Sequence, residues 1–149
     1  MMSGAYPQSG QIQRGFTLIE LMIVVVIVAI LAAIGYPSYT RYVQDTRQAE
    51  AQGEMMALSG ALERYRAKNF SYKDANTKLS ELSPVLANSD YFTTAISVTG
   101  TGNQQYVITT KPKTGLMTGT EVLKLNSEGQ TCMKVSDCTI GSDDSWKEH

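Results

Sequence analysis

The feature that most constrains this chain is a run of apolar residues between Phe16 and Tyr36. The run has 21 residues, and the part after Glu20 contains no charged side chain. A helix rises about 1.5 Å per residue, so this length covers roughly the 30 Å hydrocarbon core of a bilayer. In lipid such a segment must be helical, because a helix satisfies its own backbone hydrogen bonds. The remaining chain is too small to wrap the helix on all sides, so the run predicts a membrane-spanning helix.

Composition divides the chain into an anchor and a head. The chain has 149 residues and a formal net charge of −1, which gives no electrostatic case for bulk nucleic-acid binding. Most aliphatic side chains lie in residues 16–36, whereas residues 66–149 are rich in Thr, Ser, Gly, Asn and Lys. We expect three parts: a polar leader at 1–15, a membrane helix at 16–37 and a head at 38–149.

The polar leader has an unusual order for a secretory signal. Its only charge is Arg14, and the small residue Gly15 comes before the apolar run rather than after it. An ordinary secretory signal is cleaved after its apolar core. Cleavage after Gly15 would instead remove the leader and keep the helix. The alternative is that Arg14 is only the basic flank of a signal anchor and holds the N-terminus in the cytoplasm.

Glu20 is the one carboxylate inside the apolar run. A charge at the centre of a membrane helix costs about 2.5–3.5 kcal/mol, and less near the interface. One interpretation is that Glu20, only a turn from the end, reaches the interface. The other follows from cleavage after Gly15, which would create an α-amino group on Phe16, one helical turn away. Pairing with that amine in a neighbouring subunit would make assembly the event that satisfies the carboxylate.

The sequence "RGFTLIELMIVVVIVAILAAI", which contains these residues, closely resembles the processing and assembly motif of type IV pilins. The resemblance implies cleavage after Gly15 by a prepilin peptidase, N-methylation of Phe16 and a role for Glu20 in subunit docking. It also implies that the stretch from Ala29 to Pro37 melts when a filament assembles. The segments "GYPSYTRYVQDTRQAEAQ" and "ALERYRAKNFSY" most resemble PilE-type minor pilins of type IVa systems.

Helix-forming sequence continues beyond the anchor. Pro37 lacks an N–H and crowds the preceding turn, which predicts a kink or a loosened turn rather than the end of the helix. Glu63 and Arg66 have the spacing of a helical ion pair. Apolar residues at a/d spacing predict that residues 38–68 form an amphipathic helix with one face buried: Met55, Leu58, Leu62 and Tyr65.

The rest of the head has the pattern of an antiparallel sheet. Residues 69–90 are a predicted connector with a short helix near Thr77–Leu82. From Tyr91 the apolar residues alternate, and "QYVITTK" follows a turn as the partner strand. The segments "EVLKLN" and "TCMKV", joined by "SEG", predict a second hairpin. The predicted fold class is α+β, the type IV pilin fold: a long N-terminal helix, half transmembrane and half amphipathic, packed on a four-stranded antiparallel sheet.

Cys132 and Cys138 are the only cysteines and have five residues between them. They make a poor zinc site, because no set of His or carboxylate ligands lies nearby and the sole His is His149. A disulfide is expected if the head is periplasmic or extracellular, where such bonds persist. A loop this short contributes about 2 kcal/mol in the chain-entropy model. The resemblance implies the same disulfide-bounded C-terminal loop.

The sequence carries no Ser/His/Asp set, no phosphate-binding glycine loop and no metal-ligand cluster. We therefore expect a structural subunit rather than an enzyme, with no cofactor and no metal. The resemblance implies a minor pilin of a type IV pilus that contributes to pilus biogenesis, twitching motility and DNA uptake. Such a protein is single-pass in the bacterial inner membrane, with its head in the periplasm, and then joins the pilus on the cell surface. Its expected partners are other major and minor pilins, the prepilin peptidase and the assembly machinery of the inner membrane.

Two alternatives stay open, a pseudopilin of a type II secretion system and the major pilin of the same pilus. A pseudopilin is expected to carry a calcium-binding loop near its C-terminus. Asp137, Asp143 and Asp144 keep that possibility, although they lack a regular ligand spacing.

Direct contact with nucleic acid is not expected. Surface lysines on a sheet are more often solubilising charges than a DNA site. No aromatic residues interleave with them to stack on bases. The lysines in question are Lys111, Lys113, Lys124 and Lys134.

Overall fold

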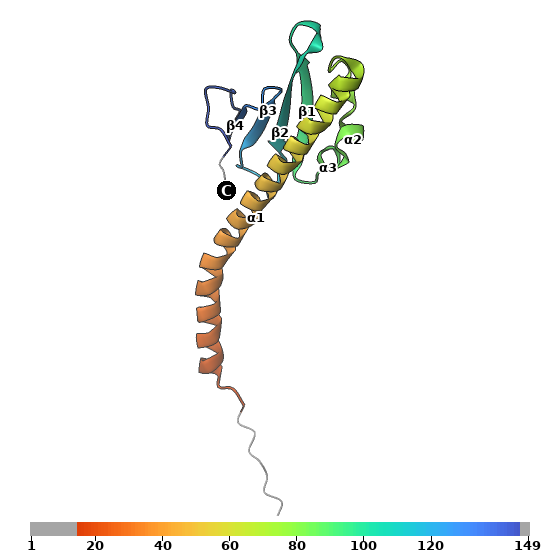
Figure 1. Ribbon diagram of the computed structural model, residues 1–149. Helices are drawn as coiled ribbons and strands as arrows, with labels where there is room; N and C mark the ends of the chain where they lie inside the picture. Colours follow the sequence, from red (N-terminus) through yellow and green to blue (C-terminus); the bar gives the residue numbers. More distant parts are fainter. Residues whose placement is uncertain (1–14, 147–149) are drawn as a thin grey trace, which may run out of the picture. The chain divides into compact units, whose positions relative to one another are not determined.

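A computed structural model of the protein describes residues 15–146. The chain divides into two compact units, one that ends at Ser38 and one that begins at Tyr39. One long helix, α1 (Leu18–Asn69), contributes to both units (Figure 1). Apart from Gly15, the predicted leader lies outside the described residues.

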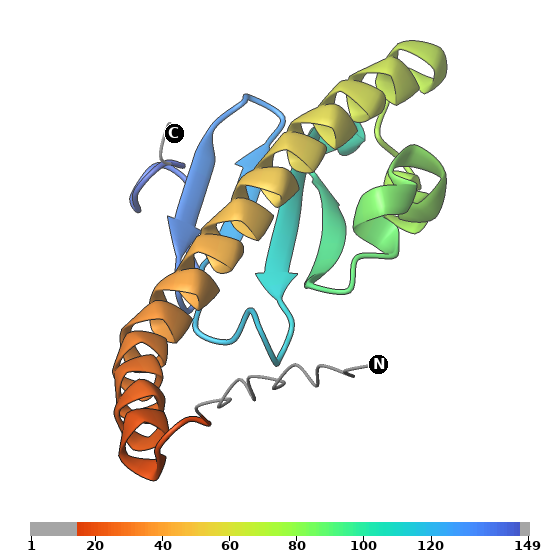
Figure 2. The ribbon, with the colours of Figure 1, turned by 90° about the horizontal axis from the view of Figure 1, so that it is seen from below.

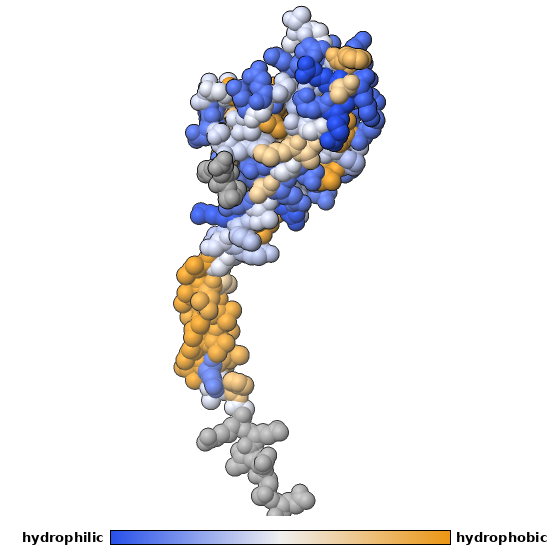
Figure 3. Space-filling view, viewed as in Figure 1, coloured by the Kyte–Doolittle hydropathy of each residue, from blue (hydrophilic) through white to orange (hydrophobic). Residues whose placement is uncertain are grey.

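In the first unit, α1 exposes apolar side chains on every face. Every residue from Gly15 to Ser38 is exposed, and the space-filling view shows this segment as an almost continuous apolar surface (Figure 3). Within the described residues, α1 is the one helix long and apolar enough to cross a membrane. Pro37 lies inside α1 and the helix continues through it, as predicted. The hydroxyl of Ser38 donates to the carbonyl of Ile34 at 3.3 Å, so this carbonyl of the turn that precedes the proline has a hydrogen-bond partner.

The second unit is built on a four-stranded antiparallel sheet in the order β1-β2-β3-β4. The strands are β1 (Phe92–Thr99), β2 (Gln105–Pro112), β3 (Val122–Asn126) and β4 (Thr131–Lys134). Each strand pairs with its sequence neighbour, so the sheet is a simple meander. The predicted fold class is confirmed, including the alternation in β1, whose residues from Phe92 to Ile96 are alternately buried and exposed.

The second half of α1 lies across one face of this sheet (Figure 2). Met55, Leu58 and Leu62 are fully buried, as their a/d spacing predicts, whereas Tyr65 is only partly buried. Its side chain is amphipathic, and its hydroxyl donates to the carbonyl of Lys73 at 2.8 Å. The helix stripe packs against inward-facing residues of all four strands, among them Ile96, Ile108, Leu123 and Met133.

The connector between helix and sheet contains three short helices where the sequence predicted one. They are η1 (Ala75–Thr77), α2 (Leu79–Leu82) and α3 (Pro84–Ala87). Ser83 separates α2 from α3 because its hydroxyl caps α3, accepting from the N–H of Leu86 at 3.4 Å, and Pro84 occupies the first turn. A further short helix, η2 (Thr101–Asn103), lies in the β1–β2 turn.

The predicted ion pair between Glu63 and Arg66 is wrong. The Glu63 carboxylate accepts from the Tyr72 hydroxyl at 2.5 Å, and Arg66 donates through Nε to Gln104 at 3.1 Å. Helical spacing makes such a pair possible, but an exposed pair is weak enough for tertiary partners to replace it.

Candidate functional site

The start of α1 holds three of the predicted functional residues close together. Gly15, Phe16 and Glu20 line one open hollow with Thr17. An added Cβ at Gly15 would meet no atom within 4 Å, and the Phe16 side chain is exposed. The scissile bond predicted after Gly15 therefore lies in accessible chain just before the helix.

Thr17 makes a helix-capping contact that the sequence analysis missed. Its hydroxyl accepts from the backbone N–H of Glu20 at 3.3 Å, and its carbonyl accepts from the N–H of Leu21 at 3.2 Å. Thr17 therefore caps α1, and Thr-x-x-Glu is the spacing of a capping box. The acidic residue also lies in the first turn, where the helix dipole favours negative charge. This local pattern could have been read from the sequence.

The Glu20 carboxylate belongs to none of the ion pairs between described residues. It lies one turn from Phe16 at the exposed end of an apolar helix. A carboxylate in this position can form an ion pair with a cation of another molecule. Lipid around it would strengthen that pair, because charges attract more strongly at low dielectric. Pro37, the other predicted assembly residue, lies at the far end of the same unit.

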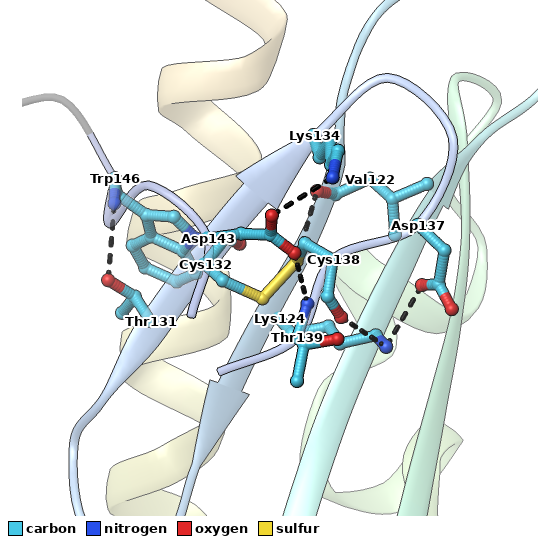
Figure 4. The surroundings of a disulfide bond; sticks show 10 residues. All are labelled: Val122, Lys124, Thr131, Cys132, Lys134, Asp137, Cys138, Thr139, Asp143 and Trp146. Atoms are coloured by element: carbon cyan, nitrogen blue, oxygen red, sulfur yellow. Dashed lines mark hydrogen bonds and ion pairs between the residues drawn. A yellow bond between two sulfur atoms is a disulfide. The ribbon is translucent and has the colours of Figure 1, made fainter. Parts of the chain in front are cut away.

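Cys132 and Cys138 form a disulfide, as the sequence predicted. Cys132 lies on β4, and both cysteines are buried. The C-terminal segment lies beside the bond, with Trp146 next to Cys132 (Figure 4), and the indole N–H of Trp146 donates to the carbonyl of Cys132 at 3.1 Å. The backbone N–H of Met133 donates to the backbone carbonyl of Asp144 at 2.9 Å.

Two lysines of the sheet hold the C-terminal end of this disulfide loop and the segment that follows it. Lys124 on β3 pairs with Asp137 at 2.9 Å and donates to the carbonyl of Cys138 at 2.7 Å. Lys134 on β4 pairs with Asp143 at 3.0 Å, and the same carboxylate accepts from the N–H of Thr139 at 2.7 Å. The loop is therefore fastened to the sheet by charge as well as by sulfur.

These contacts lower the pKa of both carboxyl groups. The hydrogen bond from Lys124 is the main cause of the lowered pKa of Asp137. The pKa of Asp143 is lowered first by the Thr139 N–H and then by Lys134. Because both carboxylates already bind lysine, they are not free ligands, and the described residues contain no group of three metal-ligating side chains. The calcium loop of the pseudopilin alternative therefore gains no support here.

The four sheet lysines do not form a patch of free cations. Lys124 and Lys134 are paired, and Lys113 donates to the carbonyl of Ser89 at 2.6 Å. Lys111 is exposed on β2 and lies near enough to Asp137 to contribute to its lowered pKa. Three of the four thus serve the fold of the head.

Two models of known protein families match the chain, one over its apolar N-terminal segment and one over its head. A model described as "Prokaryotic N-terminal methylation motif" matches residues 11–36, and one described as "Type IV minor pilin ComP, DNA uptake sequence receptor" matches residues 37–134. The second match covers more than half of the chain.

The chain belongs to the type IV pilin family.

Relatives of this pilin include both pilins and pseudopilins. It is 33% identical to the fimbrial protein EcpC of Eikenella corrodens over 119 residues, which are 80% of this chain and 76% of that protein. It is also 33% identical to the type IV major alpha-pilin of Moraxella bovis, over 78% of this chain and 64% of that protein. Identity to the type II secretion system core protein G of Pseudomonas aeruginosa is 40%, over 47% of this chain and 49% of the relative. The pilin therefore spans about half the length of that pseudopilin.

The fold agrees with a solved minor pilin. The crystal structure of the non-core minor pilin PilV of Neisseria meningitidis matches with a TM-score of 0.52 and 18% identity, over 69% of this chain and 98% of that one. At this identity the match supports the fold of the pilin and nothing finer. The methylation motif and the apolar helix together identify a membrane-anchored pilin, whose relatives assemble with other pilin subunits.

Proposed function

We propose that this pilin is a minor subunit of a type IV pilus, stored in the inner membrane and built into the filament at low abundance. The observation that carries the proposal is the match of the minor-pilin family model to residues 37–134, which is nearly the whole second unit. The head distinguishes one pilin from another, because subunits of one filament need compatible anchors but can present different surfaces. The match to the head therefore favours a minor pilin over the pseudopilin alternative.

The anchor supports a specific sequence of events. A prepilin peptidase cleaves after Gly15, and Phe16 becomes the methylated N-terminus. The apolar sides of α1 lie in lipid until the assembly machinery of the inner membrane moves the subunit into the filament, where neighbouring helices cover them. Glu20 then meets the N-terminal amine of a neighbour, which offsets the desolvation of the carboxylate. The disulfide supports a head in the periplasm, because such bonds persist there.

Mass spectrometry of sheared pili tests this proposal. We expect a mature chain that starts at methylated Phe16 and is present in small amount beside a more abundant pilin. A chain that starts at Met1 contradicts the processing. A chain that dominates the filament mass is the major pilin, and one that is absent from pili but needed for protein secretion is a pseudopilin.

A second candidate function is the binding of DNA during uptake. The observation that favours it is the printed description of the matching family, a receptor for a DNA uptake sequence. Deletion of the gene should then reduce transformation by more than it reduces piliation. Equal loss of both would indicate that the protein serves only filament assembly, and a deletion strain that still twitches and transforms normally would remove both roles.

A further inference from the structure

A groove on the head lies between the second half of α1 and the segment that leads into β1. It has a volume of about 310 Å³ and is lined by residues of α1, of α3 and of the chain from 88 to 92. All of these residues belong to the second unit. The volume is at the lower end of the range for small-ligand sites, so the groove suits a side chain of a partner rather than a folded element.

The floor of this groove is apolar. Ala51, Leu86 and Phe92 line it and belong to the buried core, whereas Val85 lines it with 55% of its surface exposed. The alkyl stem of a long side chain can lie on such a surface while its polar end stays at the rim.

The wall at residues 88–90 is ordered by its own hydrogen bonds. The side-chain amide of Asn88 donates to the carbonyl of Pro84 at 2.9 Å. The hydroxyl of Ser89 accepts from the backbone N–H of Tyr91 at 3.3 Å. A partner therefore meets a preformed wall, and little ordering of this segment opposes its binding.

The charge of the groove is negative. Glu50, Glu54 and Asp90 line it, and Arg47 is the one cation among its lining residues. The Arg47 guanidinium pairs with Glu50 at 2.7 Å and lies over the ring of Tyr91, 4.6 Å from the ring centre. Because Arg47 is already engaged, the groove offers no unpaired cation to an acidic partner.

Glu54 and Asp90 are the carboxylates left for a partner. Neither belongs to an ion pair between described residues. Lys113 reaches this wall, but its amine donates to the carbonyl of Ser89. Carboxylates on a surface are ordinary by themselves. Here they border an apolar groove in which the guanidinium of Arg47 is already held by a carboxylate and a ring.

We propose that this groove docks a lysine or arginine side chain from the head of a neighbouring pilin in the filament. The stem of that side chain lies on Val85 and Leu86, and its cation binds Glu54 and Asp90. The inference rests on the proposed function as a filament subunit. Charge complementarity selects a basic side chain, and like-charge repulsion disfavours anionic headgroups and phosphates.

The head also displays cations of the required kind, in a separate place. A helical filament is built from heterologous contacts, in which one patch of a subunit meets a different patch of the next. Arg64 and Lys68 are exposed on later turns of α1, outside the groove, and belong to none of the ion pairs between described residues. A head of this type therefore presents both the acidic groove and basic side chains that a neighbour's groove would accept.

Photo-crosslinking in assembled pili tests the docking directly. The full-length protein carries p-benzoylphenylalanine in place of Val85, and sheared pili are irradiated, digested and analysed by mass spectrometry. We expect a crosslink to another pilin at a segment that contains a lysine or arginine. The same amino acid in place of Val135, which is 60% exposed and outside the groove, is the matched control and should not give that crosslink.

Charge variants test the two carboxylates. Glu54→Gln with Asp90→Asn should lower the amount of the protein in pili, relative to the membrane, about 2- to 25-fold, the effect of two surface ion pairs. The head should melt at the wild-type temperature, because neither carboxylate forms an ion pair with another described residue. Asp45→Asn with Glu128→Gln removes the same charge outside the groove and should enter pili in the wild-type amount.

A charge exchange tests the pairing itself. Glu54→Lys should lower entry into pili further than the neutral variant does. Changing the crosslinked lysine or arginine of the neighbour to glutamate should then restore entry. Rescue of this kind requires direct pairing, and its failure would contradict a contact between these two side chains.

The outcomes separate this inference from the function on which it rests. If the wild-type protein is absent from pili, both are wrong. If it is present, but the Val85 position gives no crosslink to a pilin and the neutral variant enters pili normally, the docking is wrong and the proposed function stands. A crosslink to a segment without a basic residue would overturn the choice of a cation as the occupant.

Discussion

The two halves of α1 belong to one helix but meet different surroundings. From Leu18 to Ser38 every side chain is exposed, whereas from Tyr39 to Asn69 one stripe is buried beneath the sheet. In the first half the apolar residues cover all sides, and in the second they keep a single face. A helix that is apolar all round needs lipid or other helices around it, while a helix with one apolar stripe completes a core of its own protein. The difference teaches that only the second half is stabilised within the single chain.

The first test removes the carboxylate of Glu20, the one charged side chain of the apolar half of α1. Glu20→Ala should leave membrane insertion intact or improved and should strongly reduce entry into pili, because loss of one partner from a buried ion pair is worth about 3–5 kcal/mol. The head should melt at the wild-type temperature, since its core contains no residue of the first half. Quantification in sheared pili and in membranes measures both effects. Asp45→Ala removes an exposed carboxylate from the second half and is the control, and wild-type amounts of the Glu20→Ala protein in pili would exclude the docking role.

The second test compares apolar truncations in the two halves. Leu62→Ala should lower the free energy of unfolding of the head by about 2–5 kcal/mol, because Leu62 is fully buried and leaves a cavity. Ile27→Ala, the same kind of change in the exposed half, should not alter it. Urea unfolding in detergent, followed by near-UV circular dichroism, gives both values. A similar loss in the two variants would mean that the first half also contributes to the core of the single chain.

The third test concerns the disulfide loop, the covalent part of the head. Replacing both cysteines, Cys132→Ser with Cys138→Ser, should destabilise the head by about 2 kcal/mol in the chain-entropy model. The ion pairs of Lys124 with Asp137 and of Lys134 with Asp143 remain, so we expect a folded protein with a lower melting temperature. Intact mass after alkylation, with and without reductant, checks the pairing in the exported protein. Two free thiols in the non-reduced native protein would show that the bond does not form in the cell.

The smallest expected effect is the pH dependence of the loop contacts. The pKa values of Asp137 and Asp143 lie below the ordinary 3.8, so these carboxylates stabilise the folded head above that pH. The contribution is lost as the pH falls through their folded-state pKa values. Melting curves between about pH 5 and pH 2 should therefore fall less steeply for Asp137→Asn with Asp143→Asn than for wild type. Glu128→Gln is the control for an exposed carboxylate in the β3–β4 turn and should follow the wild-type curve.

Much of the fold could be predicted because the informative patterns are local. The apolar run, the stripe of Met55, Leu58 and Leu62, and the alternation that begins at Phe92 each reflect the period of one element. The Thr17 cap belongs to the same class, since it depends on residues three apart. The candidate assembly site at Gly15, Phe16 and Glu20 is equally local, and its assigned roles stay predictions that the experiments above address.

By itself, the sequence determined which segments are helix, strand and anchor, because periodicity and apolar length act along the chain. Only the tertiary structure decided which partner each charged side chain of the head binds. Glu63 accepts from Tyr72 instead of pairing with Arg66, and Lys124 and Lys134 pair with Asp137 and Asp143. Those partners are brought together by the packing of helix, sheet and C-terminal segment, and an exposed charge is held too weakly by its helical neighbour to resist them.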